Sequence, residues 1–186
     1  MVRRHAQCAC RRTPLGVPGS QRRRAAGFRP RHPGQSNHAS AYLGRANLLR
    51  AQGNLDQALS DLDQAIKLNP ESAQAFHARG LIYQRNGNHV RAITDFDNAI
   101  DRDPFAAAPY QARGQSYLAT NKIDLAVEDF NAGLNVDSKN PDGWAGLGLA
   151  YEKRGNRTKA AESYQRALTL DPNNTVARSG ASRVRV

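Results

Sequence analysis

Three arginines and three aspartates recur at one fixed spacing, and their side chains are the best placed in this sequence for specific chemistry. Each arginine precedes an aspartate by sixteen residues, and the pairs follow one another 34 residues apart: Arg45 with Asp61, Arg79 with Asp95, and Arg113 with Asp129. A guanidinium and a carboxylate can form a bidentate ion pair if the chain between them turns back on itself. The fourth copy of the spacing carries neither group and has Leu147 and Ser163 instead. Because both partners are lost together, we expect each arginine to pair with the aspartate of its own unit.

Two alternatives to this pairing remain open. The charges could be solvated independently, or each aspartate could pair with the arginine of the following copy. The second alternative would place Asp129 opposite Leu147 and leave Arg45 alone, whereas pairing within a unit accounts for every copy. An exposed ion pair contributes only about 0–1 kcal/mol, so we interpret these pairs as structural contacts that fix the register of two helices.

Other reactive groups are few, and their spacing does not indicate catalysis. Residues 39–186 contain no phosphate-binding glycine loop, nucleophile elbow or metal-ligand spacing. Cys8 and Cys10 have only His5 close by, and a zinc site needs about four ligands. We therefore interpret the two cysteines as unpaired thiols and expect no metal, no cofactor and no enzymatic activity.

The elements that position the charged pairs follow from a period of 34 residues across residues 39–174. The eighth position of each copy is small: Ala46, Gly80, Gly114 and Gly148. The twentieth is always alanine: Ala58, Ala92, Ala126 and Ala160. The fourth is aromatic, and the twenty-fourth is bulky: Tyr42, Phe76, Tyr110 and Trp144, then Leu62, Phe96, Phe130 and Tyr164. Apolar residues three and four apart indicate helices, and small residues are needed where two helices approach closely.

Each copy also carries the signals that end its two helices. Three copies have glycine before asparagine at the middle of the unit, at Gly53, Gly87 and Gly155, and the third copy has Asn121 in the place of glycine. Glycine accepts the left-handed conformation that ends a helix, and asparagine tolerates it. Proline closes three of the four copies, at Pro70, Pro104 and Pro172, and it disfavours helix at the preceding residue. Each unit is therefore predicted to be a helical hairpin.

This period, with its small, aromatic and proline positions, resembles the tetratricopeptide repeat over 136 of the 186 residues. The resemblance implies an all-α fold, a right-handed solenoid of four hairpins formed by residues 39–72, 73–106, 107–140 and 141–174. Residues 175–186 are expected to form a short helix that covers the last hydrophobic face. The copies are similar to those of bacterial members, including lipoproteins of the NlpI type.

The resemblance also implies a peptide-binding groove lined by the first helix of each unit. The positions that line this groove in the family give eight polar candidates: Asn47, Arg50, Gln74, His77, Gln84, Arg85, Gln111 and Gln115. Amides donate and accept hydrogen bonds, which suits the main chain of a peptide, and the two arginines could hold an acidic side chain. The alternative is a groove that is only hydrated.

A tail of a heat-shock chaperone is disfavoured as the ligand. Chaperone-binding members of the family hold a terminal carboxylate with lysine, asparagine and arginine on three successive first helices. Only Asn47 matches that set here, because the other positions carry Leu43, Ala78, Ala108 and Ala112.

We therefore expect a non-catalytic adaptor or scaffold that binds a protein or peptide in the groove. One alternative is the substrate-recognition part of a larger enzyme such as a glycosyltransferase. Another is binding of nucleic acid or an anionic surface through the amino-terminal arm, residues 1–38. Nucleic acid is disfavoured because the arm has a single aromatic residue, Phe28, and no base-reading module.

The arm holds most of the excess positive charge. The net charge is +11, and residues 1–38 carry nine arginines and no acid. Such a composition cannot bury an apolar face, so disorder is predicted. The alternatives are a transit peptide or a wrongly assigned start, in which case further repeats would precede residue 39. No apolar segment is long enough to span a membrane, and the compartment stays open: cytoplasmic as written, periplasmic if the true start lies upstream.

Overall fold

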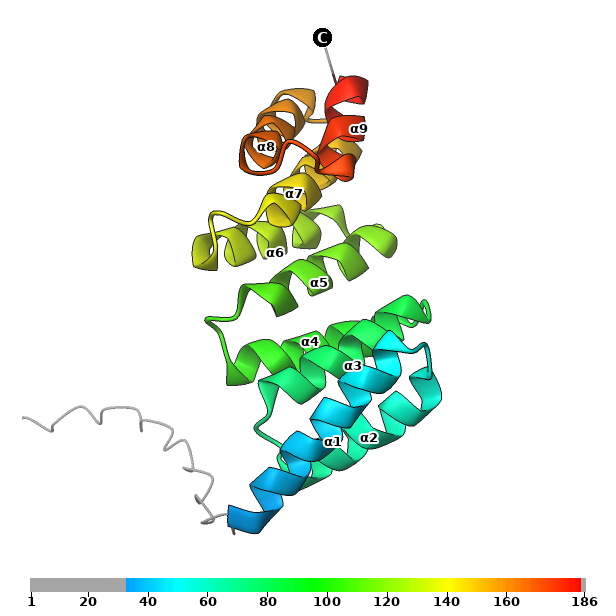
Figure 1. Cartoon of the computed structure of the whole chain (residues 1–186). Coiled ribbons are helices and arrows are strands. Elements are labelled where there is room, and N and C mark those ends of the chain that lie inside the picture. The colour runs from blue at the N-terminus through cyan, green and yellow to red at the C-terminus, as the bar shows by residue number, and fades with distance from the viewer. Residues whose placement is uncertain (1–32, 185–186) are drawn as a thin grey trace, which may run out of the picture. The chain divides into compact units, whose positions relative to one another are not determined.

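The computed structural model describes residues 33–184, which form nine α-helices and no strand (Figure 1). The helices are α1 (Pro33–Ala51), α2 (Leu55–Leu68), α3 (Ala73–Arg85), α4 (His89–Arg102), α5 (Ala107–Ala119), α6 (Ile123–Val136), α7 (Pro141–Lys153), α8 (Arg157–Leu170) and α9 (Thr175–Val184). The prediction of an all-α repeat fold is confirmed. None of these nine helices combines the length and the apolar character that crossing a bilayer requires.

The start of α1 differs from the boundary expected from the period. Residues 33–38, which the sequence places in the arm, already belong to this helix. Proline is well tolerated in the first turn of a helix, where its missing N–H would have no partner, so Pro33 can begin α1. The rest of the arm, with His5, Cys8 and Cys10, lies outside the described residues.

The helices associate first within a repeat and then between repeats. Each odd-numbered helix from α1 to α7 packs on the helix that follows it, and successive pairs meet through α2 and α3, α4 and α5, and α6 and α7. The hairpin turns adopt the predicted left-handed conformation, with φ of 85° at Gly53, 74° at Gly87, 83° at Gly155 and 59° at Asn121. The predicted turn residues are therefore confirmed.

The small residues lie where two helices of one repeat meet. A Cβ added to Gly80 would lie 2.6 Å from the ring of Phe96, and one added to Gly148 would lie 2.6 Å from the ring of Tyr164. In the first repeat Ala46 shares an apolar cluster with Leu62 instead of an aromatic residue. The eighth position can be alanine there because the residue opposite it is smaller.

Helix α9 covers the last repeat. Its Ala177, Gly180 and Val184 are buried, and a Cβ on Gly180 would collide with the ring of Tyr164, which is fully buried. The Tyr164 hydroxyl donates a hydrogen bond of 2.6 Å to Glu152, and Arg183 donates to the same carboxylate at 2.7 Å. The carboxylate on α7 thus joins α8 to α9.

Candidate peptide-binding groove

Three of the predicted groove residues come together at one pocket between the first two repeats. Asn47 and Arg50 on α1 and Arg85 on α3 line a pocket of about 350 Å³. Its remaining lining residues are Ala51, Leu81 and Ile82. The pocket therefore has two guanidinium groups, one amide and an apolar part, and its lining residues include no acid.

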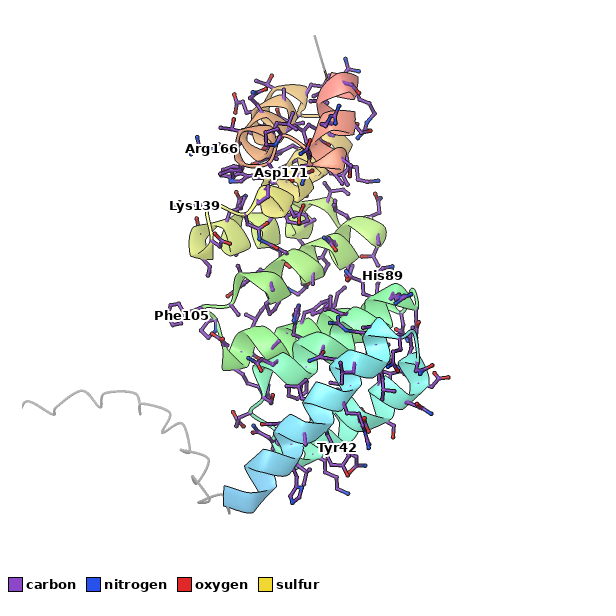
Figure 2. All side chains as sticks on the ribbon, in the orientation of Figure 1. Tyr42, His89, Phe105, Lys139, Arg166 and Asp171 are labelled. Carbon is purple, nitrogen blue, oxygen red and sulfur yellow. The ribbon has the colours of Figure 1, made fainter. Side chains whose placement is uncertain are left out.

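His77 lies on α3, one turn before Leu81, and the positive charge of Arg50 acts on its imidazole. Burial of the imidazole, and then the positive charge of Arg50, lower the pKa of His77 from its ordinary value of 6.5. The imidazole ring lies 5.9 Å from the ring of Phe96. His77 is therefore mostly neutral near pH 7 and adds no third positive charge. His89 begins α4 at the hairpin turn and does not line the pocket (Figure 2).

Two of the predicted groove amides contact neighbouring helices. The Nε2 of Gln84 donates to the carbonyl oxygen of Ala112 at 2.8 Å and to the hydroxyl of Ser116 at 3.0 Å. Gln111 accepts a long hydrogen bond of 3.4 Å from Asn140. Gln84 thereby joins α3 to α5, so its amide already has partners within the fold.

The remaining two predicted amides, Gln74 and Gln115, are exposed on α3 and α5 and do not line the pocket. The structure thus gathers the arginines and Asn47 at the pocket and leaves the glutamines elsewhere. Within residues 33–184, no group of three or more His, Cys, Asp or Glu side chains is placed to hold a metal ion.

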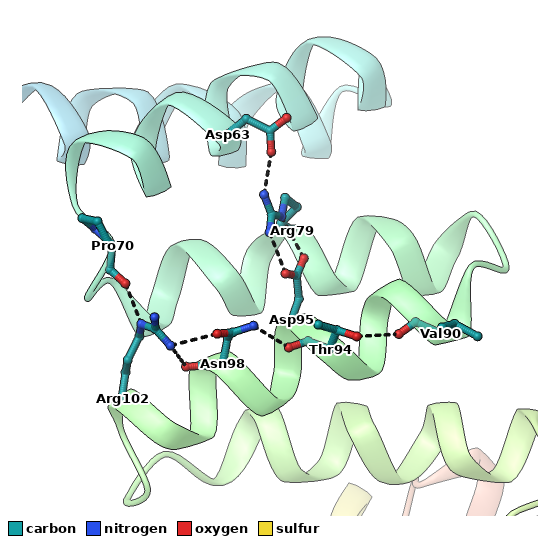
Figure 3. Close-up of polar contacts among 8 residues, drawn as sticks. All are labelled: Asp63, Pro70, Arg79, Val90, Thr94, Asp95, Asn98 and Arg102. Carbon is teal, nitrogen blue, oxygen red and sulfur yellow. Dashed lines mark hydrogen bonds and ion pairs between the residues drawn. The ribbon is translucent and has the colours of Figure 1, made fainter. Parts of the chain in front are cut away.

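The structure also brings together all three predicted arginine and aspartate pairs. Arg79 donates from Nε and Nη2 to the two carboxylate oxygens of Asp95 at 2.8 and 2.7 Å (Figure 3). Arg45 binds Asp61 in the same bidentate way at 2.6 and 2.6 Å, and Arg113 binds Asp129 at 2.8 and 2.6 Å.

Two of the arginines have a second partner that the sequence reasoning missed. The Nη1 of Arg79 donates to Asp63 at 2.7 Å, and the Nη1 of Arg113 donates to Asp97 at 2.5 Å. Both aspartates belong to the second helix of the preceding repeat, α2 or α4. Each of these arginines therefore connects its own repeat to the one before.

A signal for this second contact is present in the sequence. The twenty-fifth position is aspartate at Asp63 and Asp97, each of which precedes a copy with arginine. It is Asn131 in the third copy, and the fourth copy has Leu147 in the place of arginine. The acid and the arginine of the following copy thus disappear together.

The number of partners matches the burial of each arginine. The side chain of Arg79 is 20% exposed and that of Arg45 is 64% exposed. The hydrogen bonds that Arg79 donates to Asp95 raise the pKa of Arg79, and those that Arg45 donates to Asp61 lower the pKa of Asp61. The first repeat therefore has the same ion pair as the next two, but its arginine is much more exposed to solvent.

Comparison with known proteins identifies the family. The family model described as tetratricopeptide repeat matches residues 43–107 and 112–175, which together make up more than half of the chain. No curated protein matches the sequence.

Several solved structures share the fold at low sequence identity. A crystal structure of MamA protein is 20% identical with a TM-score of 0.72, covering 81% of this chain and 81% of that one. The pilF protein of Pseudomonas aeruginosa is also 20% identical, with a TM-score of 0.74 and coverage of 81% and 69%. The first such domain of Spaghetti (RPAP3), bound to an HSP90 peptide, is 23% identical with a TM-score of 0.60 and covers 61% of this chain and 90% of that one. With the family model matching across all four helical hairpins, the chain belongs to the tetratricopeptide repeat family.

Proposed function

We propose that this protein is a non-catalytic adaptor that binds a peptide or protein ligand, with an acidic side chain of the ligand held at the pocket between α1 and α3. The observation that carries the proposal is the convergence of Arg50 and Arg85 from two repeats at a pocket without acidic lining residues. Two like charges brought together without a counter-charge favour an anionic ligand.

Each group at the pocket has a separate role in this proposal. A carboxylate between the two guanidinium groups would accept charge-assisted hydrogen bonds, which are shorter and stronger than neutral ones. The Asn47 amide would bind the main chain of the ligand, because it can both donate and accept. Leu81, which is partly exposed at the pocket, would contact an apolar side chain next to the acidic one.

The solved structures support peptide binding as a use of this fold, since the domain of RPAP3 holds an HSP90 peptide. Of the clamp residues that chaperone-binding members use, this chain has only Asn47. We therefore favour an acidic side chain within the ligand over a terminal carboxylate.

An array of acidic peptides, each paired with a version in which one acid is replaced by its amide, tests the proposal on the full chain. Peptides that lose binding in the amide form would then be titrated in solution against the chain and two variants. The pocket variant combines Asn47→Ala, Arg50→Ala and Arg85→Ala. The control combines Lys139→Ala, on a loop far from the pocket lining (Figure 2), with Arg157→Ala and so loses the same charge.

We expect the pocket variant to bind at least about tenfold more weakly, as loss of charge-assisted hydrogen bonds implies, and the control to bind like the wild type. Both variants should keep the helical circular dichroism spectrum. Equal weakening in the two variants would show attraction to net charge alone and would contradict a site at this pocket.

A further inference from the structure

One face of α1 is exposed although the same face is buried in every later first helix. Leu48 is 66% exposed, whereas Ile82, at the corresponding position of α3, is 0% exposed. The corresponding Ser116 and Ala150 of α5 and α7 are also buried. This face of α1, which we call the leading face, consists of Ala41, Gly44, Arg45 and Leu48.

The later repeats show what covers this face. Ala78 and Ile82 of α3 share one apolar cluster with Leu62 of α2. On α7, a Cβ added to Gly146 would collide with the ring of Phe130 on α6. In each case the covering element is the second helix of the preceding repeat, and it presents its bulky twenty-fourth residue to the small sixth residue of the next repeat.

The leading face has room for the same kind of residue. Gly44 occupies the sixth position of the first copy, and a Cβ added there would meet nothing within 4 Å. Arg45 lies between two hollows of about 410 and 240 Å³, the first lined by Leu49 and Ser60 and the second by Ala41 and Tyr42.

The leading face also has a hydrogen-bond donor that no described residue uses, Nη1 of Arg45, on a guanidinium that is otherwise paired with Asp61. Arg79 and Arg113 use Nη1 to bind an aspartate of the preceding helix. Among the described residues, the hydrogen bonds of Arg45 go only to Asp61, through Nε and Nη2. The group that binds the preceding helix in two repeats therefore has no acid to bind in the first.

We propose that the leading face binds an amphipathic helix of a separate protein. That helix carries a large apolar residue, an aspartate at the next position and an aliphatic residue three positions after the aspartate. The chain's own α4 shows this pattern in Phe96, Asp97 and Ile100, and it lies against α5 in the way the partner would lie against α1. The apolar residue enters the space beside Gly44, the aspartate binds Nη1 of Arg45, and the aliphatic residue covers Ala41.

Charge disfavours two occupants that residues 1–186 could supply. The arm, residues 1–38, carries nine arginines and no acid, so it offers no partner to Arg45. In a head-to-tail contact a second copy would present α9, which has Arg178 and Arg183 and no acid. Both would bring further positive charge to Arg45.

The test uses a synthetic peptide with the sequence of residues 89–102, that of α4. Because a helix of this length is marginal in water, a lactam bridge between positions 94 and 98 would hold the peptide helical. Binding of the labelled peptide to the full chain would be measured by fluorescence polarisation. A scrambled peptide of the same composition measures unspecific attraction to the basic arm.

Three variants of the chain locate the binding. Gly44→Leu fills the space for the apolar residue, and Leu48→Glu places an acid on the leading face. Both change exposed positions, so the thermal unfolding midpoint should not fall. Val90→Glu changes a residue on α4 that is 75% exposed and serves as the control.

We expect saturable binding of the α4 peptide that is lost with Gly44→Leu and Leu48→Glu and kept with Val90→Glu. The Asp97→Asn peptide should bind about fivefold more weakly, as expected for an exposed ion pair, and this difference should shrink at high salt. Equal binding by all variants, or no more binding than the scrambled peptide, would overturn the proposal. So would self-association of the chain that Leu48→Glu abolishes and that excludes the peptide, because the occupant would then be a second copy.

Discussion

At the scale of single residues, burial decides what each ion pair contributes. Asp95 is 3% exposed and lies against Arg79, which also binds Asp63 and contacts the rings of Phe76 and Tyr83. Removing one member of a buried pair leaves an uncompensated charge, whereas replacing both members by neutral side chains can cost little. The fourth repeat shows such a replacement, with Leu147 and Ser163 in the two places.

Arg79→Leu should therefore destabilise the protein by about 3 kcal/mol, and the double variant Arg79→Leu with Asp95→Ser should recover most of that loss. Arg45→Leu should cost much less than Arg79→Leu because the Arg45 side chain is largely exposed. Urea unfolding followed by circular dichroism measures all three. A double variant as unstable as the single one would contradict this view of the buried pair.

His77 gives a second prediction at the residue scale. Its pKa lies below 6.5 in the folded protein, chiefly because of burial and secondly because of Arg50. As the pH falls below about 6.5, the histidine of the unfolded chain takes up a proton before His77 of the folded protein does. The contribution of neutral His77 to the free energy of unfolding is therefore complete above that pH and is lost as the pH falls toward the folded pKa.

An NMR titration of the His77 ring protons should show this depressed pKa directly. In the Arg50→Gln variant the pKa should rise and still stay below 6.5, because burial is the larger cause and is unchanged. The His77→Gln variant should lose the corresponding slope of stability below about pH 6.5. A pKa at or above the ordinary value in the wild type would show that the ring is solvated.

At the scale of helices, the seam inside each repeat depends on the fit of two side chains. A Cβ on Gly80 would lie 2.6 Å from the ring of Phe96, whereas a Cβ on Gly114 would lie 3.2 Å from the ring of Phe130. Alanine gains about 1 kcal/mol over glycine in a helix, while overpacking costs about 1–3 kcal/mol. The clash outweighs the gain at Gly80, and the two are close to balanced at Gly114.

Gly80→Ala should therefore lower the thermal unfolding midpoint by several degrees, as a loss of about 1–2 kcal/mol implies, and Gly114→Ala should change it little. The double variant Gly80→Ala with Phe96→Leu reproduces the Ala46 and Leu62 combination of the first repeat. It should be more stable than the single variant Phe96→Leu. Circular dichroism melts measure the series. Equal effects of the two glycine substitutions would count against the seam as the cause.

At the scale of the whole described unit, stability is distributed over contacts between neighbours, so the last repeat depends on α9. Tyr164 is fully buried, and Gly180 of α9 lies against its ring. The sequence contains one tryptophan, Trp144, on α7 in the same repeat. Trp144 packs against the apolar clusters of the third and the fourth repeat, so its fluorescence reports on this end of the repeat array.

Removal of residues 175–186 should lower the urea midpoint seen by Trp144 fluorescence more than the midpoint seen by far-ultraviolet circular dichroism. Arg183→Ala removes an exposed ion pair with Glu152 and a hydrogen bond to Ser179 and should shift either midpoint far less than the truncation does. Two midpoints that fall together in the truncated chain would mean that the unit unfolds as one cooperative block.

The sequence was sufficient for features that repeat within a unit. The left-handed turn at Asn121 and the alanines of the seam follow from local chemistry seen four times. Contacts between units were harder to predict, since the partner of Arg79 at Asp63 becomes visible only when positions of different copies are compared.

The groove amides show a second limit. A register assigns Gln84 to the groove, but it cannot reveal that Ala112 and Ser116 on the next helix bind the amide. The start of α1 shows a third limit. Residues 67–72, one period after residues 33–38, end α2 and form a loop, so the period does not predict a helix at residues 33–38.

The bridging arginines also determine which units can be duplicated. If residues 73–106 were inserted a second time after Ala106, the new Arg79 would meet Asp97, and the new Ala78 would meet Phe96 as Ala112 does now. A second copy of residues 107–140 would instead place Arg113 opposite the amide of Asn131. Lengthening the protein without disturbing its charge network is thus possible at the second unit and not at the third.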